Sequence, residues 1–127
     1  MSVHVRRTDY NSYLKRKLNV TLVTEDFFVR QMDYFRKKYV NTLFVVVSDD
    51  PDWCERKLNL SDTVVLRGNS PEQDLSVMAQ CNHSIFDYGT FGEWGALMAG
   101  GETLLYNLSS GTEVKLATLL PNWHLVT

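Results

Sequence analysis

The stretch "LFVVVS", residues Leu43–Ser48, decides the fold of this 127-residue chain. It is a continuous apolar run with three β-branched valines, which is typical of a strand covered on both faces and therefore of a parallel sheet. Four further short apolar runs read as strands in the same way. They are Val3–Arg6, Thr63–Leu66, Ser84–Asp87 and Thr103–Tyr106.

Helical patterns lie between these strands. In Glu25–Val40 an apolar stripe recurs at helical spacing, formed by Phe28, Met32, Phe35 and Tyr39, and it predicts a core-facing helix. Asp50 before Pro51 is typical of an N-cap followed by proline at the first helical position. "SPEQ" (70–73) and "TFGE" (90–93) have capping-box patterns, and the second of these helices is expected to stop at Gly100–Gly101. Alternating strands and helices predict one α/β domain over residues 1–127, a Rossmann-type parallel sheet in three layers.

Composition narrows the class of partner. Apolar residues make up 44% and charged residues 22% of the chain, as in ordinary soluble domains. Residues 1–40 carry nine Lys/Arg against four Asp/Glu, whereas residues 41–127 carry four against eleven. This uneven distribution favours a small anionic ligand over a nucleic acid, which would need a basic face across the whole domain.

Targeting signals disagree with one another. No apolar run is long enough to cross a membrane and no secretory signal opens the chain, which alone would predict a cytosolic protein. Acceptor sites for N-glycosylation nevertheless occur at Asn19, Asn59, Asn82 and Asn107, where chance would give about one. They are either coincidence or the mark of a secretory-pathway protein whose targeting segment lies outside this chain. Cys54 and Cys81 form no CxxC pair, and the sequence leaves open whether they form a disulfide.

Three polar clusters follow predicted strands, where open parallel sheets bind their ligands. They are His4–Asp9, Ser48–Asp50 and Asp87–Gly92. Because side chains alternate along a strand, Arg6 and Arg7 should point to different sides, with one arginine facing the crevice. An arginine there can hold a diphosphate through paired hydrogen bonds. The other is expected to pair with Asp9 or another carboxylate; the alternative is a surface salt bridge without a ligand.

The remaining candidates are a helix start and several isolated polar residues. Thr90 is expected to cap a helix whose free N–H groups favour an anion, with Gly89 and Gly92 allowing close backbone approach; the alternative is an ordinary helix start closed by Glu93. Asp74 could accept the N–H groups of a guanine edge or only complement a helix dipole. No GxGxxG or P-loop lysine motif is present.

Metal binding has weaker support. Asp49 and Asp50 could hold a metal ion, although capping accounts for Asp50 better. His83 and His124 lack metal-ligand spacing and are predicted to be packing or surface residues.

These same stretches resemble a known family. "HVRRTDY" (4–10), "VVVSDDPDWC" (45–54) and "SPEQDLSVMAQCNHSIFDYGTFGEWGALMAGG" (70–101) are similar to the three motif regions of the galactoside alpha-1,2-fucosyltransferases, in that family's order. The resemblance implies the C-terminal, nucleotide-sugar-binding half of a GT-B glycosyltransferase that uses GDP-fucose, inverts the sugar carbon and requires no metal. It also implies a luminal Golgi enzyme anchored in the membrane by an N-terminal segment, acting on a galactose-terminated glycan.

Carried over by position, the resemblance assigns roles to seven residues. Arg6 matches the arginine that holds the pyrophosphate and stabilises the leaving group, and Arg7 matches its supporting neighbour. His4 and Asp74 match residues near the guanine or ribose. Thr90, Phe91 and Gly92 match the segment that meets the phosphates or the base.

One departure from the family limits these expectations. Family members are about twice this long or more, so the acceptor half and the membrane anchor are expected to lie outside this chain. The general base is unassigned, with Asp9 a weak candidate. The alternatives are an inactive nucleotide-sugar-binding remnant and an unrelated mononucleotide-binding domain.

Overall fold

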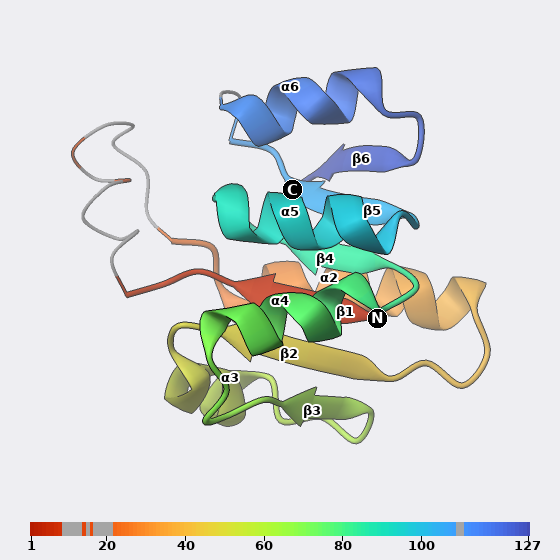
Figure 1. Ribbon diagram of the computed structural model, residues 1–127. Coiled ribbons are helices and arrows are strands. Elements are labelled where there is room, and N and C mark those ends of the chain that lie inside the picture. The colour runs from red at the N-terminus through yellow and green to blue at the C-terminus, as the bar shows by residue number, and fades with distance from the viewer. Residues whose placement is uncertain (9–13, 15, 17–21, 109–110) are drawn as a thin grey trace.

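The protein is built on one six-stranded, wholly parallel sheet (Figure 1). The computed structural model covers residues 1–127 and describes all of them except 9–13, 15, 17–21 and 109–110. The strands are β1 (Ser2–Val5), β2 (Phe44–Ser48), β3 (Thr63–Val65), β4 (Ser84–Phe86), β5 (Thr103–Tyr106) and β6 (Trp123–Val126). Their order, β3-β2-β1-β4-β5-β6, is the doubly wound order of a Rossmann sheet, so the predicted fold class is confirmed.

Five helices among the described residues cover the sheet. They are α2 (Glu25–Lys38), α3 (Pro51–Lys57), α4 (Pro71–Ala79), α5 (Thr90–Ala99) and α6 (Thr112–Leu119). The strand order runs from β1 toward β3 and from β4 toward β6, and right-handed crossovers in opposite directions place helices on opposite faces. Accordingly α4 and α5 lie in front of the sheet in Figure 1 and α2 lies behind it.

The predicted strands agree with the observed ones to within one residue at each end. The strand predicted as Val3–Arg6 is Ser2–Val5, and the one predicted to reach Asp87 ends at Phe86. Arg6 and Asp87 therefore lie just beyond the carboxyl ends of adjacent strands β1 and β4. A sixth strand and the helix before it, β6 and α6, were not predicted.

Two of the three predicted helix starts are confirmed. Asp50 caps α3, its side chain accepting from Trp53 N. Ser70 and Gln73 form both hydrogen bonds of a capping box on α4. The prediction that Thr90 caps α5 is wrong, because Gly89 is the N-cap and Thr90 is the first helical residue. Gly89 has φ 94°, a left-handed conformation that favours glycine over threonine.

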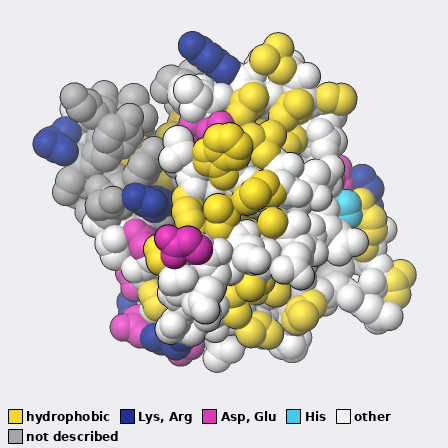
Figure 2. All heavy atoms as spheres, in the orientation of Figure 1, with side chains coloured by type: hydrophobic (Ala, Val, Ile, Leu, Met, Phe, Trp, Pro, Cys, Tyr) yellow, Lys and Arg dark blue, Asp and Glu magenta, His cyan; other side chains and the backbone are white. Residues whose placement is uncertain are grey.

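The core lies mainly between the sheet and α2. Phe28, Met32 and Phe35 of α2 are fully buried, as their helical spacing predicts. The opposite face is less well covered. Apolar side chains are visible on the face formed by α4 and α5 (Figure 2), and Trp94 and Met98 of α5 are 58% and 47% exposed. Cys54 and Cys81 are both free thiols.

Candidate functional site

A cleft of about 260 Å³ opens at the carboxyl edge of the central strands. It lies beside β1 and β2, between the loop that precedes α4 and the first turn of α5. The residues that line it are His4, Arg6, Val47, Ser48, Asp49, Asn69, Pro71, Asp74 and Phe91. Four of the seven predicted site residues therefore meet here: His4, Arg6, Asp74 and Phe91.

The two arginines that follow β1 lie on different sides, as strand alternation predicts. Arg6 lines the cleft, where its Nε is 3.9 Å from Asp49 Oδ2. Arg7 turns away and places its guanidinium 4.0 Å from the ring centre of Trp53 on α3. The Arg7 Nη1 also donates to the Val23 carbonyl at 3.4 Å. The expected partner Asp9 lies outside the described residues, so Arg7 is braced within the described part of the chain by a ring and a carbonyl.

His4 lines the cleft but is almost completely buried. Its side chain is only 4% exposed, and burial lowers the pKa of His4 to about 4; the Asp49 charge opposes this shift, and the Arg6 charge adds a smaller lowering. The imidazole is therefore neutral at physiological pH. Its ring centre is 5.1 Å from that of Phe91. His4 Nδ1 is buried and has no hydrogen-bond partner among the described residues.

Gly92 explains how α5 comes so close to β1. A Cβ at Gly92 would lie 2.6 Å from Phe86 Cδ2 and 3.0 Å from His4 Nδ1. Both distances are shorter than ordinary van der Waals contact, so only glycine permits this packing. Gly92 supports the cleft from below and does not line it.

Asp74 brings a second unsatisfied polar atom to the cleft. It lies in the first turn of α4, and its Oδ1 is buried without a hydrogen-bond partner in the described part of the chain. Asn69 and Pro71 line the cleft from the same connection. Sequence reasoning missed Asn69, although it lies one residue before the capping box that positions Asp74.

The start of α5 is fixed by a buried carboxylate. Glu113 of α6 is 6% exposed, and its Oε1 accepts from Gly89 N at 3.3 Å. The predicted reach of Glu93 back to the helix start is replaced by a contact with Thr112, whose hydroxyl is 3.4 Å from Glu93 Oε2. Thr90 itself is exposed and does not line the cleft. Phe91 is thus the residue of the predicted segment Thr90–Gly92 that lines the cleft.

The other polar candidates have structural partners. His83 stacks against both Phe35 and Tyr39, with ring centres 5.5 and 4.6 Å away, and His124 lies 3.3 Å from Glu102 at the surface. Both histidines are packing or surface residues, as predicted. No group of three metal-binding side chains occurs among the described residues. No helix of this part of the chain is long and apolar enough to cross a membrane.

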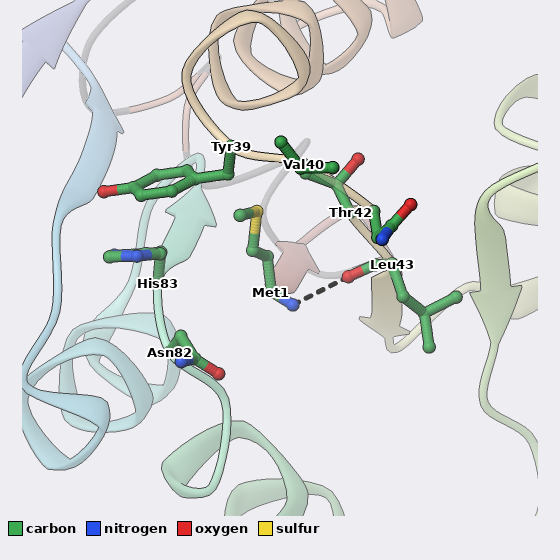
Figure 3. Close-up of a pocket in the computed structure, with 8 residues that line it drawn as sticks. Met1, Tyr39, Val40, Thr42, Leu43, Asn82 and His83 are labelled. Carbon is green, nitrogen blue, oxygen red and sulfur yellow. Dashed lines mark hydrogen bonds between the residues drawn. The ribbon is translucent and has the colours of Figure 1, made fainter.

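A larger hollow, of about 390 Å³, lies at the opposite edge of the sheet (Figure 3). Tyr39, Asn82 and His83 line it, together with Met1, whose amino group donates to the Leu43 carbonyl at 2.7 Å. It contains none of the predicted site residues and no arginine or lysine side chain. The smaller cleft is the better candidate for an anionic ligand, because Arg6 lines it together with His4 and Asp74, each of which carries a buried polar atom without a hydrogen-bond partner among the described residues.

Sequence comparison with known proteins is consistent with the fold and the motifs. Over 97% of its length the chain is 36% identical to galactoside alpha-(1,2)-fucosyltransferase 2 of Sus scrofa, of which it covers 40%. It is 36% identical to galactoside 2-alpha-L-fucosyltransferase SEC1 of Bos taurus and 33% identical to galactoside alpha-(1,2)-fucosyltransferase 1 of Sus scrofa, in each case over 97% of the chain and 37% of the relative. No solved structure matches. The chain spans about two fifths of the length of these relatives.

A match to a family-wide sequence pattern covers the whole chain. Residues 1–127 match the pattern described as glycosyl transferase family 11. The Rossmann sheet, the motif order and the full-length match agree, and the chain belongs to glycosyl transferase family 11.

Proposed function

We propose that this chain is the donor-binding half of a galactoside 2-alpha-L-fucosyltransferase and that its cleft binds GDP-fucose. The observation that carries the proposal is the convergence of His4, Arg6, Asp74 and Phe91 on one cleft at the carboxyl edge of a Rossmann sheet. Three segments far apart in sequence, around His4 and Arg6, Asp74 and Phe91, meet here because of the strand order and the placement of α4 and α5. Ligands of open α/β sheets bind near the point where the strand order reverses; here that point lies between β1 and β4, and the cleft beside β1 is next to it.

The unsatisfied atoms suit a guanine base. Buried polar atoms without partners are costly, so His4 Nδ1 and Asp74 Oδ1 favour a ligand that completes their hydrogen bonds. A carboxylate accepts the paired N–H groups of a guanine edge, whereas adenine presents an acceptor at the corresponding ring nitrogen. Neutral His4 can donate or accept one hydrogen bond without adding charge. Phe91 offers an aromatic face against the base or ribose.

The diphosphate would bind to Arg6. In the proposed reaction the fucose C1–O bond breaks as the 2-hydroxyl of a terminal galactose attacks from the opposite side, so the sugar carbon is inverted. The electron pair of the broken bond stays on GDP, and the Arg6 guanidinium stabilises that growing negative charge. The hydroxyl proton leaves to a base that these residues do not identify. No metal is required in this proposal, because the arginine supplies the positive charge.

The proposal extends to the setting of the whole protein. The alpha-(1,2)-fucosyltransferase relatives are about two and a half times as long as the matched region, and we propose that the acceptor glycan binds to a separate half. We further propose that the protein works on the luminal side of the Golgi membrane, held by an N-terminal anchor. The glycosylation acceptor sites of the sequence support this location.

Calorimetry with GDP, GDP-fucose and ADP tests the donor site. Wild type should bind both guanine nucleotides and discriminate against ADP, and Arg6→Ala should lose GDP binding while remaining folded. Arg7→Ala should have a milder effect, because its guanidinium stacks on Trp53 outside the cleft. Arg30→Ala is the matched control, since Arg30 is exposed on α2. Equal affinity for all three nucleotides would remove the guanine assignment.

Transfer of labelled fucose to lactose separates two forms of the proposal. Transfer by this chain would make it an enzyme in its own right. GDP-fucose binding without transfer would make it a nucleotide-sugar-binding unit that needs an acceptor half, which its 37–40% coverage of the relatives favours.

A further inference from the structure

The three residues that directly follow β1 all donate their backbone amides to aspartate side chains. Arg6 N donates to Asp87 Oδ2 at 2.9 Å, beyond the end of β4. Arg7 N and Thr8 N donate to the two oxygens of Asp49, beyond the end of β2, at 2.9 and 3.0 Å. The Thr8 hydroxyl also donates to Asp49 Oδ2 at 2.6 Å. The turn that carries Arg6 is thus held from both neighbouring strands.

This arrangement depends on the position of β1 in the sheet. Because β1 pairs with β2 on one side and β4 on the other, the residues that follow those strands flank its exit. Asp87 is 1% exposed and also accepts from Tyr88 N at 2.7 Å, so it is rigidly held. On the other side, the Ser48 hydroxyl donates to the Val5 carbonyl at 2.7 Å and fixes the end of β2 against the end of β1.

The same hydrogen bonds prevent the backbone N–H groups of this turn from binding an anion. Turns that bind phosphate commonly do so through successive free N–H groups. Here the amides of Arg6, Arg7 and Thr8 are already occupied by carboxylates. The three amides of this turn are therefore not available to a diphosphate, so the turn can contribute to anion binding through the Arg6 side chain, whose placement depends on how firmly the turn is fixed.

Direct attraction between Arg6 and Asp49 is a smaller contribution. Their side chains are 30% and 27% exposed, and the closest charged atoms are 3.9 Å apart. Partly exposed pairs of this kind contribute little to stability because solvent screens them. The backbone hydrogen bonds are shorter and fix the geometry of the turn.

We infer that Asp49 and Asp87 form a carboxylate clamp on the β1 exit and act as positioning residues for the diphosphate-binding side chain of Arg6. The diphosphate role rests on the proposed function, whereas the clamp itself is a property of the ligand-free protein. The two can therefore be tested separately. Asp49→Ala is the variant to use, because Asp87 is buried and its replacement could prevent folding.

Amide hydrogen exchange in the ligand-free protein tests the clamp. Asp49→Ala should speed exchange at Arg7 and Thr8 and leave Arg6, which Asp87 holds, nearly unchanged. Asp52→Ala is the matched control, because Asp52 is an exposed carboxylate of α3 whose partner is Arg67. Unchanged protection of Arg7 and Thr8 in Asp49→Ala would overturn the clamp.

A double-mutant cycle on GDP affinity tests the positioning role. Asp49→Ala should weaken GDP binding about tenfold in wild type and have no further effect in an Arg6→Ala background, since residues acting through one another are non-additive. Additive losses would overturn the role, because a general loss of structure would act in both backgrounds. Tighter GDP binding by Asp49→Ala would also overturn it, showing Asp49 to be a competing charge. Failure of wild type to bind GDP would overturn the proposed function, and the positioning role with it.

Discussion

His4 shows how one residue can serve fold and site together. It belongs to a central strand, so its side chain is buried, and the same burial keeps the imidazole neutral beside Arg6. A neutral ring tolerates the neighbouring guanidinium, whereas an imidazolium would be repelled by it. Side chains alternate along β1, and His4 and Arg6, two positions apart, both line the cleft.

The depressed pKa of His4 makes stability pH-dependent. Its pKa is about 4 in the folded protein against an ordinary 6.5, so the stabilisation is fully present above pH 6.5 and is lost as pH falls toward 4. A shift of this size corresponds to about 3 kcal/mol. Urea unfolding of wild type and His4→Phe from pH 7 to 4 should show the wild type losing more stability than the variant. Parallel profiles would contradict the buried neutral state.

We predict that replacing Gly92 by any residue with a side chain destabilises the protein. Gly92→Ala would push a methyl group against the Phe86 ring and His4 Nδ1, which should cost about 1–3 kcal/mol of unfolding free energy and weaken GDP binding. Gly95→Ala on the same helix is the control, because its closest contact is the flexible end of Met78. Thermal denaturation of both variants measures the difference, and equal losses would show that the close approach of α5 to β1 is not special.

Other features of individual residues could not be predicted from the sequence. Asp49 and Asp87 are 38 positions apart in the chain, and nothing local indicates that both hold the turn after β1. Their pairing follows only from the order β2-β1-β4. Thr90 was mistaken for the cap because its hydroxyl fits that role, but Gly89 is the N-cap, and its amide donates to Glu113 of α6.

At the scale of elements, those with strong local signals were predictable. The valine run of β2 and the start signals of α3 and α4 were read correctly. α6 was not predicted because its N-cap is Gly111 and no side chain caps it. β6 was not predicted because "WHLV" has one buried position, Trp123, and an exposed histidine, a pattern typical of an edge strand.

The capping box of α4 should have a measurable effect. Ser70→Ala removes the hydroxyl that accepts from Gln73 N, which should lower the unfolding free energy by about 1 kcal/mol. Asp74 follows Gln73 directly in the first turn of α4. Loosening this turn should therefore weaken nucleotide binding as well. Gln73→Ala breaks the reciprocal bond to Ser70 N and provides the comparison. Unchanged stability in both variants would mean that packing alone fixes the start of α4.

At the scale of the whole molecule, alternating strands and helices predicted a Rossmann-type sheet but not the order of its strands. More than one doubly wound order satisfies that alternation. The observed order decides which polar segments meet, and it separates the two edges of the sheet. The candidate cleft occupies the carboxyl edge, and the turns that enter the strands occupy the opposite edge.

Two glycosylation acceptor sites lie on those entering turns. Asn59 precedes β3 and Asn82 precedes β4, and both are exposed. If the protein passes through the secretory pathway as proposed, both should carry glycans that leave the cleft open. Glycosidase treatment of the protein purified from its own cells should release them, and Asn59→Gln and Asn82→Gln should each lose one without changing GDP affinity. A protein unaffected by the glycosidase would contradict the luminal location.

The most direct test of the central claim is a crystal structure of the complex with GDP. The account predicts diphosphate oxygens within hydrogen-bond distance of the Arg6 guanidinium and a guanine edge against the Asp74 carboxylate, in the cleft between the α4 and α5 starts. GDP bound in the hollow beside Tyr39 and His83 instead, or in the cleft without contact to Arg6, would contradict it.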